Sequence, residues 1–223
     1  MKLNILIAVF LATLFSSACL SQPTDQIKDL NTKLINGETT ISRILSDPAY
    51  ISLHSLTAFR EIIKQNAKAE KIKLNTMAEP GTNITVKGST LNRFGKPLIN
   101  ALVYVYQTSS QGWYSDTAPH ILINGGDRKH ARLFGYFKTN ATGTFEITTV
   151  KPAGYPNSSL PAHIHIEIAM DDNSYFISEL LFDDDPRLVG EIRDRSMREK
   201  FFIVKNSGTA TAPVYEYVIK PDN

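Results

Sequence analysis

The chain contains 223 residues, with 24 lysine and arginine residues against 22 acidic residues and a formal net charge of +2. A charge this close to zero lacks the basic excess with which proteins attract nucleic acid, so we expect no nucleic-acid partner. The single cysteine excludes a disulfide framework, and the length is enough for one domain with a substantial buried core.

The first 18 residues have the pattern of a signal peptide. Lys2 is followed by an apolar run at residues 5–15, which is too short to span a membrane, and then by Ser-Ser-Ala. Cys19 comes directly after this motif, as in the lipobox of bacterial lipoproteins, in which the cysteine is lipid-modified. Because Ser16 stands where the lipobox usually has leucine, cleavage by an ordinary signal peptidase is the alternative. We therefore expect an exported protein, anchored to a bacterial cell envelope through Cys19 or else secreted or periplasmic.

Residues 19–78 are predicted to form a tether and a short helical arm. Asp25 can cap a first helix that Gly37 ends, and a second helix is predicted to begin at Asp47 with Pro48 in its first turn. We expect the arm to pack on the main domain or on a second subunit, which would make a homodimer, and we interpret His54 as an ordinary helix residue. The apolar stripes that recur at spacings of three and four are Ile27, Leu30 and Leu34 on the first helix, and Leu53, Leu56, Phe59, Ile63 and Ala67 on the second.

Residues 79–223 are predicted to form the main domain. Short segments rich in β-branched and aromatic residues are separated by turn sequences, of which residues 140–143 are the clearest, and strands do not alternate with helices. The pattern therefore predicts a mainly β fold, an antiparallel β-sandwich. The predicted strands are residues 84–87, 101–107, 133–138, 144–149, 162–170, 175–182, 200–205 and 214–219.

Two long connections separate these strands. Residues 115–132 contain His120 and His130, and connections of this length in compact domains are usually functional or mobile. Either histidine could touch a substrate, but a surface histidine in a loop needs no such role. Residues 183–200 open with three aspartates, which could bind calcium or form a solvated turn before Pro186.

The segment Pro-Ala-His-Ile-His at residues 161–165 carries the clearest chemical signal. Side chains alternate along a strand, so His163 and His165 should share one face while Ile164 and Ile166 face the core. Two imidazoles on one face of a strand can bind a single transition-metal ion. On its own, however, a His-x-His pair is more often part of a half-exposed strand.

Two tyrosines favour the metal interpretation. Tyr155 lies in a turn between Pro152 and Pro156, and Tyr114 follows Gly112 and a tryptophan after a predicted strand. Two phenolates with two imidazoles would suit a hard trivalent ion, ferric iron, better than zinc. Without the histidines, either tyrosine would be interpreted as a packed side chain whose hydroxyl finds a hydrogen bond.

The segment from residue 88 to residue 182 resembles the catalytic domain of the intradiol ring-cleavage dioxygenases, the family of catechol and protocatechuate dioxygenases. The order and approximate spacing of five short motifs agree with the family. They are Gly-Lys-Pro at 95–97 with the strand at 101–107, Gly-Trp-Tyr at 112–114, residues 139–145, residues 149–156 and Pro-Ala-His-Ile-His at 161–165. The resemblance implies a transthyretin-like (prealbumin-like) topology and a ferric ion held by Tyr114, Tyr155, His163 and His165.

The resemblance also implies the reaction. The substrates would be a small aromatic diol and O2, and the ring would open between its two hydroxyl-bearing carbons to give a muconate-type diacid. Fe(3+) would act as Lewis acid and template, with no organic cofactor. Tyr155 is the ligand that the resemblance expects to be released on substrate binding and to take up a substrate proton.

One departure from the family concerns Leu160. The family usually has an arginine at this position, where it balances negative charge that develops on the substrate. Arg128 or Arg132 could supply a cation from the 115–132 loop, so we expect either weak activity on catechol or activity that depends on one of them. Glu179 corresponds approximately to a family glutamine near the site.

Two other interpretations stay open. One is a catalytically impaired, transthyretin-like binding module of the cell envelope, which the leucine at position 160 favours. The other is a zinc or copper protein built on the two histidines, which leaves the two tyrosines without a role.

Overall fold

We analysed a computed structural model of the chain, which describes residues 23–170 and 174–220. The predicted signal peptide and Cys19 lie outside these residues, so the predictions of export and of a lipid anchor stay predictions. Across the described ranges, none of the helices combines the length and the apolar character needed to cross a bilayer.

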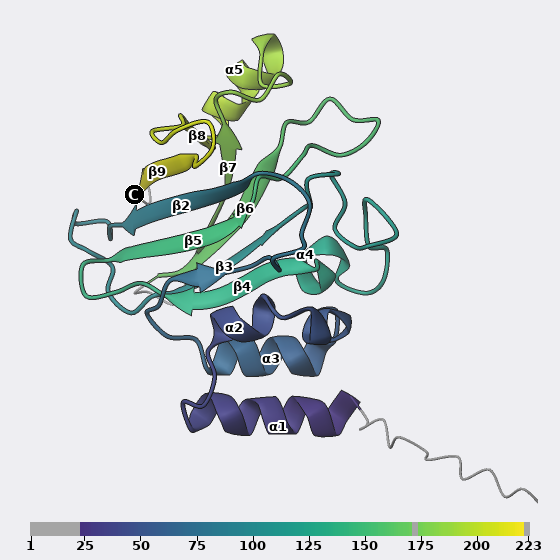
Figure 1. Cartoon of the computed structure of the whole chain (residues 1–223). Coiled ribbons are helices and arrows are strands. Elements are labelled where there is room, and N and C mark those ends of the chain that lie inside the picture. The colour runs from purple at the N-terminus through teal and green to yellow at the C-terminus, as the bar shows by residue number, and fades with distance from the viewer. Residues whose placement is uncertain (1–22, 171–173, 221–223) are drawn as a thin grey trace, which may run out of the picture.

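Two β-sheets form the body of the protein, as the sequence predicts (Figure 1). The four-stranded sheet has the order β1 (Ile72–Lys73), β5 (Thr144–Val150), β2 (Asn83–Thr90) and β9 (Val214–Ile219). The five-stranded sheet has the order β4 (Leu133–Lys138), β3 (Leu102–Gln107), β6 (His163–Ala169), β7 (Tyr175–Phe182) and β8 (Phe202–Val204). All eight predicted strands are present, with small differences at their ends.

The pairing is mixed rather than wholly antiparallel. The pairs β1–β5, β2–β9 and β7–β8 are parallel. Parallel neighbours need a crossover connection, and β7 and β8 are joined through helix α5 (Gly190–Arg198). The sequence prediction missed this helix because its residues carry only scattered apolar side chains rather than a stripe. It also missed the short α4 (Gly126–His130) within the 115–132 loop.

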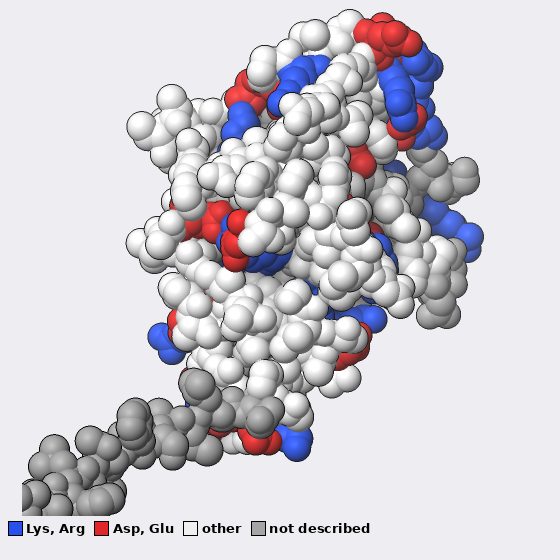
Figure 2. All heavy atoms as spheres, turned by 90° about the vertical axis from the view of Figure 1, so that its right-hand side faces the viewer, with Lys and Arg blue, Asp and Glu red and all other residues white. Residues whose placement is uncertain are grey.

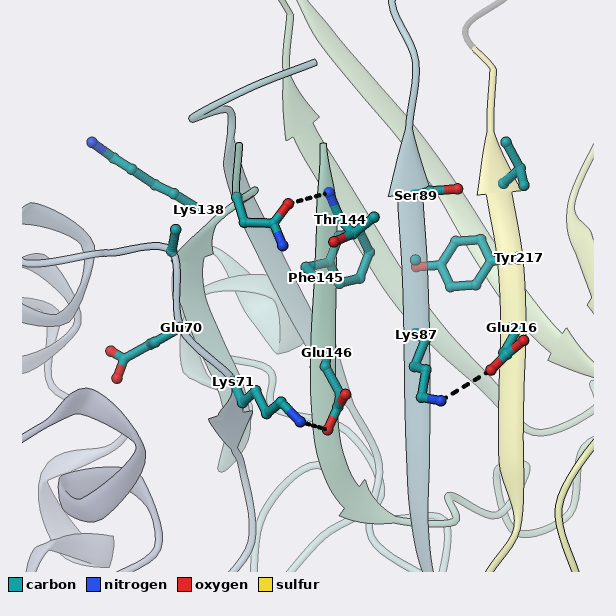
Figure 3. A pocket seen from close by; sticks show the side chains of 14 residues that line it. Glu70, Lys71, Lys87, Ser89, Lys138, Thr144, Phe145, Glu146, Glu216 and Tyr217 are labelled. Carbon is teal, nitrogen blue, oxygen red and sulfur yellow. Dashed lines mark hydrogen bonds and ion pairs between the residues drawn. The ribbon is translucent and has the colours of Figure 1, made fainter. Parts of the chain in front are cut away.

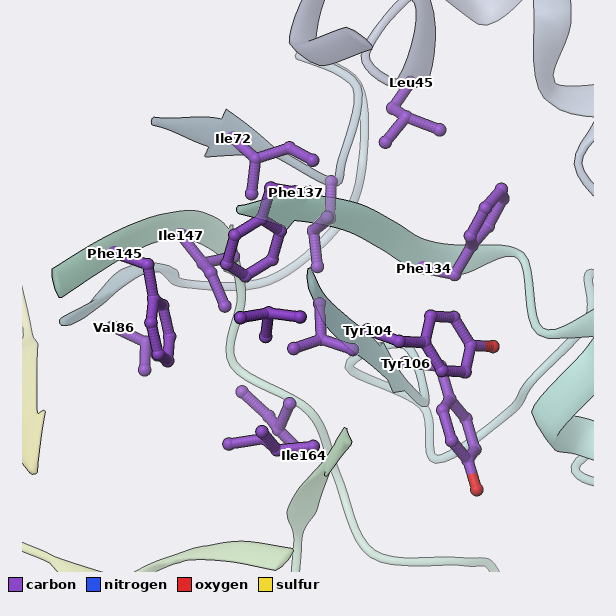
Figure 4. Close-up of a cluster of buried hydrophobic side chains, with 14 of the residues drawn as sticks. Leu45, Ile72, Val86, Tyr104, Tyr106, Phe134, Phe137, Phe145, Ile147 and Ile164 are labelled. Carbon is purple, nitrogen blue, oxygen red and sulfur yellow. The ribbon is translucent and has the colours of Figure 1, made fainter. Parts of the chain in front are cut away.

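The predicted alternation along β6 is confirmed. Ile164, Ile166 and Ile168 are fully buried between the sheets, whereas the two histidines face the other side of the strand. Figure 4 shows Ile164 and Phe137 of this sheet in one cluster with Val86 and Ile147 of the four-stranded sheet. The core therefore fixes which face of the five-stranded sheet carries the polar groups.

The helical arm packs on the main domain within the same chain (Figure 1). It consists of α1 (Pro23–Ile35), α2 (Ile41–Leu45), the 3-10 helix η1 (Pro48–Leu53) and α3 (Thr57–Gln65); α1 packs on α3, which packs on β4. Gly37 ends α1 as predicted, with a positive φ of 72° and with the amide of Glu38 donating to the carbonyl of Lys33. A homodimer through the arm stays a prediction.

The prediction of one continuous second helix is wrong, because the structure has two separate helices, η1 and α3, in its place. The chain turns between η1 and α3, so that Leu56 becomes the N-cap of α3 and is 36% exposed instead of joining the apolar stripe. The 3-10 helix ends at Leu53. After it, the amide of Leu56 donates to the carbonyl of Leu53 in a turn that leads into α3.

His54 and Arg60 fasten the arm to the 115–132 loop. His54 is buried, stacks on Phe59 with ring centroids 5.3 Å apart, and its Nδ1 lies 2.8 Å from the carbonyl oxygen of Arg132. The buried Arg60 guanidinium donates to two carbonyls of the loop, those of Ala131 at 3.0 Å and Arg128 at 3.2 Å, and to the carbonyl of His54 in the arm at 3.1 Å. His54 is therefore a packing residue that joins two segments, rather than an ordinary helix residue.

The burial of His54 predicts a loss of stability in acid. Burial lowers its pKa from 6.5 to about 4, so between these values the unfolded chain binds a proton that the folded chain does not. The free energy of unfolding therefore has its full value above pH 6.5. It decreases as the pH falls towards 4, by up to roughly 3 kcal/mol. Urea unfolding at pH 7 and pH 4.5 should show a smaller pH dependence in His54→Gln than in the wild type. His130→Gln, which removes a histidine that is only half-buried, is the control, and equal pH dependence in all three proteins would contradict the prediction.

Candidate metal centre

Four side chains from three separate segments converge at the start of β6. Tyr114 lies in the loop after β3, Tyr155 in the turn after β5, and His163 and His165 on β6 itself. The oxygen of Tyr114 is 2.8 Å from that of Tyr155 and 2.9 Å from Nε2 of His165. The oxygen of Tyr155 is 3.0 Å from Nε2 of His163, which is 3.2 Å from Nε2 of His165. The four atoms thus form a closed ring, which we call the donor ring.

The spacing of the donor ring fits a single metal ion. Nitrogen and oxygen ligands about 2.0–2.2 Å from a shared ion, the range typical of zinc, lie roughly 3 Å apart when neighbouring bonds meet at about 90°. The four distances in the donor ring agree with this value. Two phenol oxygens and two imidazole nitrogens suit ferric iron better than zinc.

The outer nitrogen of each imidazole has its own contact. Nδ1 of His163 lies 2.8 Å from the carbonyl oxygen of Pro161, and Nδ1 of His165 lies 3.5 Å from a carboxylate oxygen of Glu179. Carbonyl and carboxylate partners of this kind orient metal-binding histidines. Glu179 could also be counted with the two histidines as a ligand group, since their ligand atoms lie within 4.8 Å of one another. Its carboxylate faces Nδ1 rather than Nε2 of His165, so we assign it an orienting role.

Tyr106 supports His165 from the side opposite Glu179, a contact that the sequence analysis did not predict. It is paired with His165 across β3 and β6, as Glu179 is across β6 and β7. The rings of Tyr106 and His165 stack at 4.3 Å with 11° between their planes. His165 is therefore held between neighbours on both adjoining strands.

Burial sets the protonation of the donor ring in the absence of an ion. It lowers the pKa of His165 to about 3, so this imidazole is neutral and its lone pair is available. Burial also raises the pKa of Tyr114 and of Tyr155, so both phenols keep their protons until a strongly Lewis-acidic ion displaces them.

Two glycines allow the tyrosine segments to meet. Gly112 has a φ of 79°, and a Cβ there would lie 2.3 Å from the carbonyl oxygen of Gly154. A Cβ on Gly154 would in turn lie 2.3 Å from the guanidinium of Arg187, which donates to the carbonyls of Tyr155 and Leu160. The close approach of Tyr114 to Tyr155 therefore depends on two residues without side chains.

Replacing Gly112 by alanine should separate the two tyrosine segments. We expect a loss of roughly 1–3 kcal/mol in stability, from the positive φ and the backbone contact together, and a clear loss of bound iron. Gly95→Ala is the matched control, because Gly95 has a φ of 75° but no atom within 4 Å of its Cβ position. Urea unfolding and elemental analysis of both variants check this. Equal iron content in the two variants would show that the contact does not position the site.

A family model of dioxygenases matches residues 57–218, which is most of the chain. The chain belongs to the intradiol ring-cleavage dioxygenase family. This family uses non-haem ferric iron. That the donor ring holds the iron in this chain is still a prediction.

Individual relatives are distant. The chain is 32% identical over 120 residues to the protocatechuate 3,4-dioxygenase beta chain of Burkholderia cepacia, covering 48% of each protein. It is 26% identical over 132 residues to catechol 1,2-dioxygenase 1 of Acinetobacter lwoffii, covering 52% of this chain and 40% of the relative. The chain therefore spans about half the length of the curated relatives it matches, or less.

Solved structures agree in fold. Catechol 1,2-dioxygenase from Acinetobacter sp. ADP1, inhibited by bound mercury, has a TM-score of 0.54 at 14% identity, over 92% of this chain and 79% of its own. The dioxygenase domain of a carbohydrate-binding fusion protein from Streptomyces sp. SirexAA-E has a TM-score of 0.52 at 21% identity, over 70% of this chain and 89% of its own. At these identities the likeness concerns the fold alone.

Neither arginine that we expected from the 115–132 loop lines the cavity beside Leu160. Arg128 donates two hydrogen bonds of 2.5 Å to the buried carboxylate of Glu167. Arg132 donates to Glu79 and also pairs with Asp116. Both guanidiniums therefore have carboxylate partners elsewhere, and their placement does not support a role for them at the substrate.

The two loop histidines differ in position. The ring of His120 lies 4.5 Å from that of Tyr155 between centroids, and its Nδ1 is 2.9 Å from Asp127. His130 instead lies within hydrogen-bond distance of the carbonyl oxygens of Ser55 and Asn124. The 115–132 loop therefore brings His120 beside the donor ring and uses His130 for its own structure.

The acidic run after β7 has structural partners. Asp183 pairs with Arg193, and Asp184 with Lys151. Asp185 accepts hydrogen bonds from the amides of Ala162 and Arg187, just before the first histidine. These contacts favour the turn over the calcium site.

A cavity of about 240 Å³ opens beside the donor ring. Its walls are Tyr155, His163, Glu179, the segment 159–161, and side chains of α5 and its surroundings. A larger hollow of about 580 Å³ lies on the four-stranded sheet, where Figure 3 shows the pairs Lys71–Glu146 and Lys87–Glu216. No histidine lines that hollow among the described residues, so size alone does not identify the site.

Proposed function

We propose that this chain cleaves a catechol-type ring between its two hydroxyl-bearing carbons, using ferric iron held by Tyr114, Tyr155, His163 and His165. The observation that carries the proposal is the donor ring, in which four oxygen and nitrogen atoms lie 2.8 to 3.2 Å from their neighbours. Membership of the intradiol family supports it independently.

The bound ion would act as a Lewis acid that makes the diol ring reactive towards O2 and as a template that holds the reactants. The protein supplies the rest. The main-chain carbonyl of Pro161 and the carboxylate of Glu179 orient the two imidazoles. Tyr106 keeps the ring of His165 from turning.

The two tyrosines are suited to different roles. Tyr114 is only 1% exposed and is fixed by its neighbours, whereas Tyr155 is half-buried and lines the cavity. Tyr155 is therefore the tyrosine that can move when a diol enters. Its phenol oxygen would then accept a proton from a substrate hydroxyl, while Tyr114 stays in place.

The cavity suits a substrate with one ring. An apolar cavity of about 150 Å³ can hold benzene, and the cavity here measures about 240 Å³. Leu160, Leu181 and Phe201 contribute apolar surface to its lining. Such a wall excludes water from one side of the bound ring.

Metal analysis with an oxygen assay tests the proposal. Protein made with iron supplied should contain about one iron per chain and show the intense visible absorption of ferric tyrosinate. Given catechol, it should consume one O2 per diol and form an acyclic diacid that has gained both oxygen atoms. Zinc or copper in place of iron would support the histidine-only metal protein. Iron without O2 uptake on any diol would support the binding module.

A further inference from the structure

The segment from Tyr155 to Ala162 leads from one member of the donor ring to the strand that carries two others, and it has no regular structure. All of its residues are described, and the one main-chain hydrogen bond within it joins the amide of Ser158 to the carbonyl of Tyr155. Main-chain groups that lack partners in a helix or sheet need them from other parts of the protein or from solvent. The position of Tyr155 therefore depends on contacts from outside the segment.

The turn after β7 supplies these contacts. Nη1 of Arg187 donates to the carbonyl of Tyr155 at 3.1 Å and to that of Leu160 at 3.3 Å. The carboxylate of Asp185 accepts from the amide of Ala162 at 2.8 Å, just before β6 begins. It also accepts from the amide of Arg187 at 2.8 Å, which fixes the main chain of the arginine. The turn thus holds the segment near both ends, through a different side chain at each end.

The guanidinium of Arg187 is used for these carbonyls rather than for an ion pair. It pairs with no carboxylate among the residues that the structure describes, whereas Arg193 on α5 pairs with Asp183 at 2.6 Å. Figure 2 shows charged side chains of both signs gathered at the top of the molecule, at the height of α5 in Figure 1. Arg187 also does not line the cavity beside the donor ring, so its contact with the site runs through the main chain.

Gly154 lets the guanidinium approach the main chain beside Tyr155. A Cβ on Gly154 would lie 2.3 Å from Nη1 of Arg187 and 2.4 Å from the carbonyl oxygen of Leu160. The guanidinium thus lies against the glycine, and the segment turns around it. Tyr155 is the donor-ring tyrosine that can move when a diol enters, and a fixed main chain lets its side chain return to the same place.

We infer that Arg187 is a positioning residue for Tyr155, which holds the main chain of this tyrosine so that its phenol oxygen lies in the donor ring. This role rests on the proposed function. Because Asp185 holds the other end of the segment, loss of the guanidinium displaces Tyr155 but leaves His163 in place. Arg187 also binds the carbonyl of Leu160, so it fixes the tyrosine and this wall of the cavity relative to each other.

Arg187→Met tests this, because methionine is unbranched but donates no hydrogen bond. The variant should keep its iron through the other three ligands but lose much of the ferric-tyrosinate absorption, because one of the two tyrosinates no longer reaches the ion. Its kcat for catechol should fall by about 10- to 100-fold, the range for groups that orient a metal ligand, with a smaller change in KM. Arg187→Lys should restore part of both, since an ammonium can still donate to one carbonyl. Arg193→Met, the control, should behave as wild type.

Unchanged absorption in Arg187→Met would overturn the inference, and so would complete loss of iron, since the other three ligands should suffice. Urea unfolding shows whether each variant is folded; if Arg187→Met is not, Arg187→Lys carries the same test with a smaller expected change.

A crystal structure of the metal-free variant gives a second measurement, which does not need iron. The phenol oxygen of Tyr155, 3.0 Å from Nε2 of His163 in the wild-type chain, should lie beyond hydrogen-bond distance of it. If the wild type binds no iron, the proposed function fails and this comparison alone decides. A displaced Tyr155 would then still support the role of Arg187, and an unchanged one would refute it.

Discussion

Replacing His165 by alanine should remove iron binding and activity together. The imidazole contributes one of the four atoms of the donor ring, 2.9 Å from Tyr114 and 3.2 Å from Nε2 of His163. Loss of a partner outside the ligand set typically costs 10- to 100-fold in metal affinity or activity, so loss of a ligand should exceed about 100-fold. Elemental analysis and oxygen uptake measure both effects.

Glu179→Gln separates ligation from orientation at the same site. If Glu179 only orients His165, the variant should keep its iron and lose at most about 10- to 100-fold in activity. If it is a ligand, the variant should lose iron as His165→Ala does. His130→Ala, which removes an imidazole from the loop but not from the donor ring, should keep both iron and activity.

The strands and the donor ring were open to prediction because their signals are local. A period of two along residues 163–168 decides which side chains enter the core and which face the metal centre. From the sequence, Gly112 and Gly154 can be identified only as turn residues. In the structure, their backbones approach so closely that a side chain at Gly112 would clash, and this close approach brings the two tyrosine segments together. That these two segments meet was predicted from the family motifs, because the periodicity of a sequence carries no information about which loops lie side by side.

The partners of the arginines could not be predicted, since they join residues far apart in the chain. Arg132 meets Glu79 across 53 positions, and Arg128 meets Glu167 across 39. The sequence shows that a loop residue is a charged arginine, but it does not show which carboxylate that arginine will pair with. Helix α5 was missed for a different reason: two of its three residues that line the cavity, Arg195 and Ser196, are polar, so the helix lacks an apolar stripe.

Replacing Leu160 by arginine should raise the rate on unsubstituted catechol. Leu160 lines the cavity beside His163 and is 44% exposed, so an arginine fits at little cost in stability, about 0.5 kcal/mol or less. The family resemblance expects an arginine at this position, and Arg128 and Arg132 do not line the cavity. The wild-type chain should therefore turn over catechol slowly.

The expected gain in kcat is large, up to about 10²-fold. Removing one preorganised group that stabilises developing negative charge at a reacting centre typically lowers kcat by about 10²- to 10³-fold. Leu160→Met tests whether length alone matters, and Leu122→Arg adds the same charge at an exposed loop position outside the cavity. Neither should change kcat. A high wild-type rate that Leu160→Arg leaves unchanged would show that this chain needs no cation at position 160.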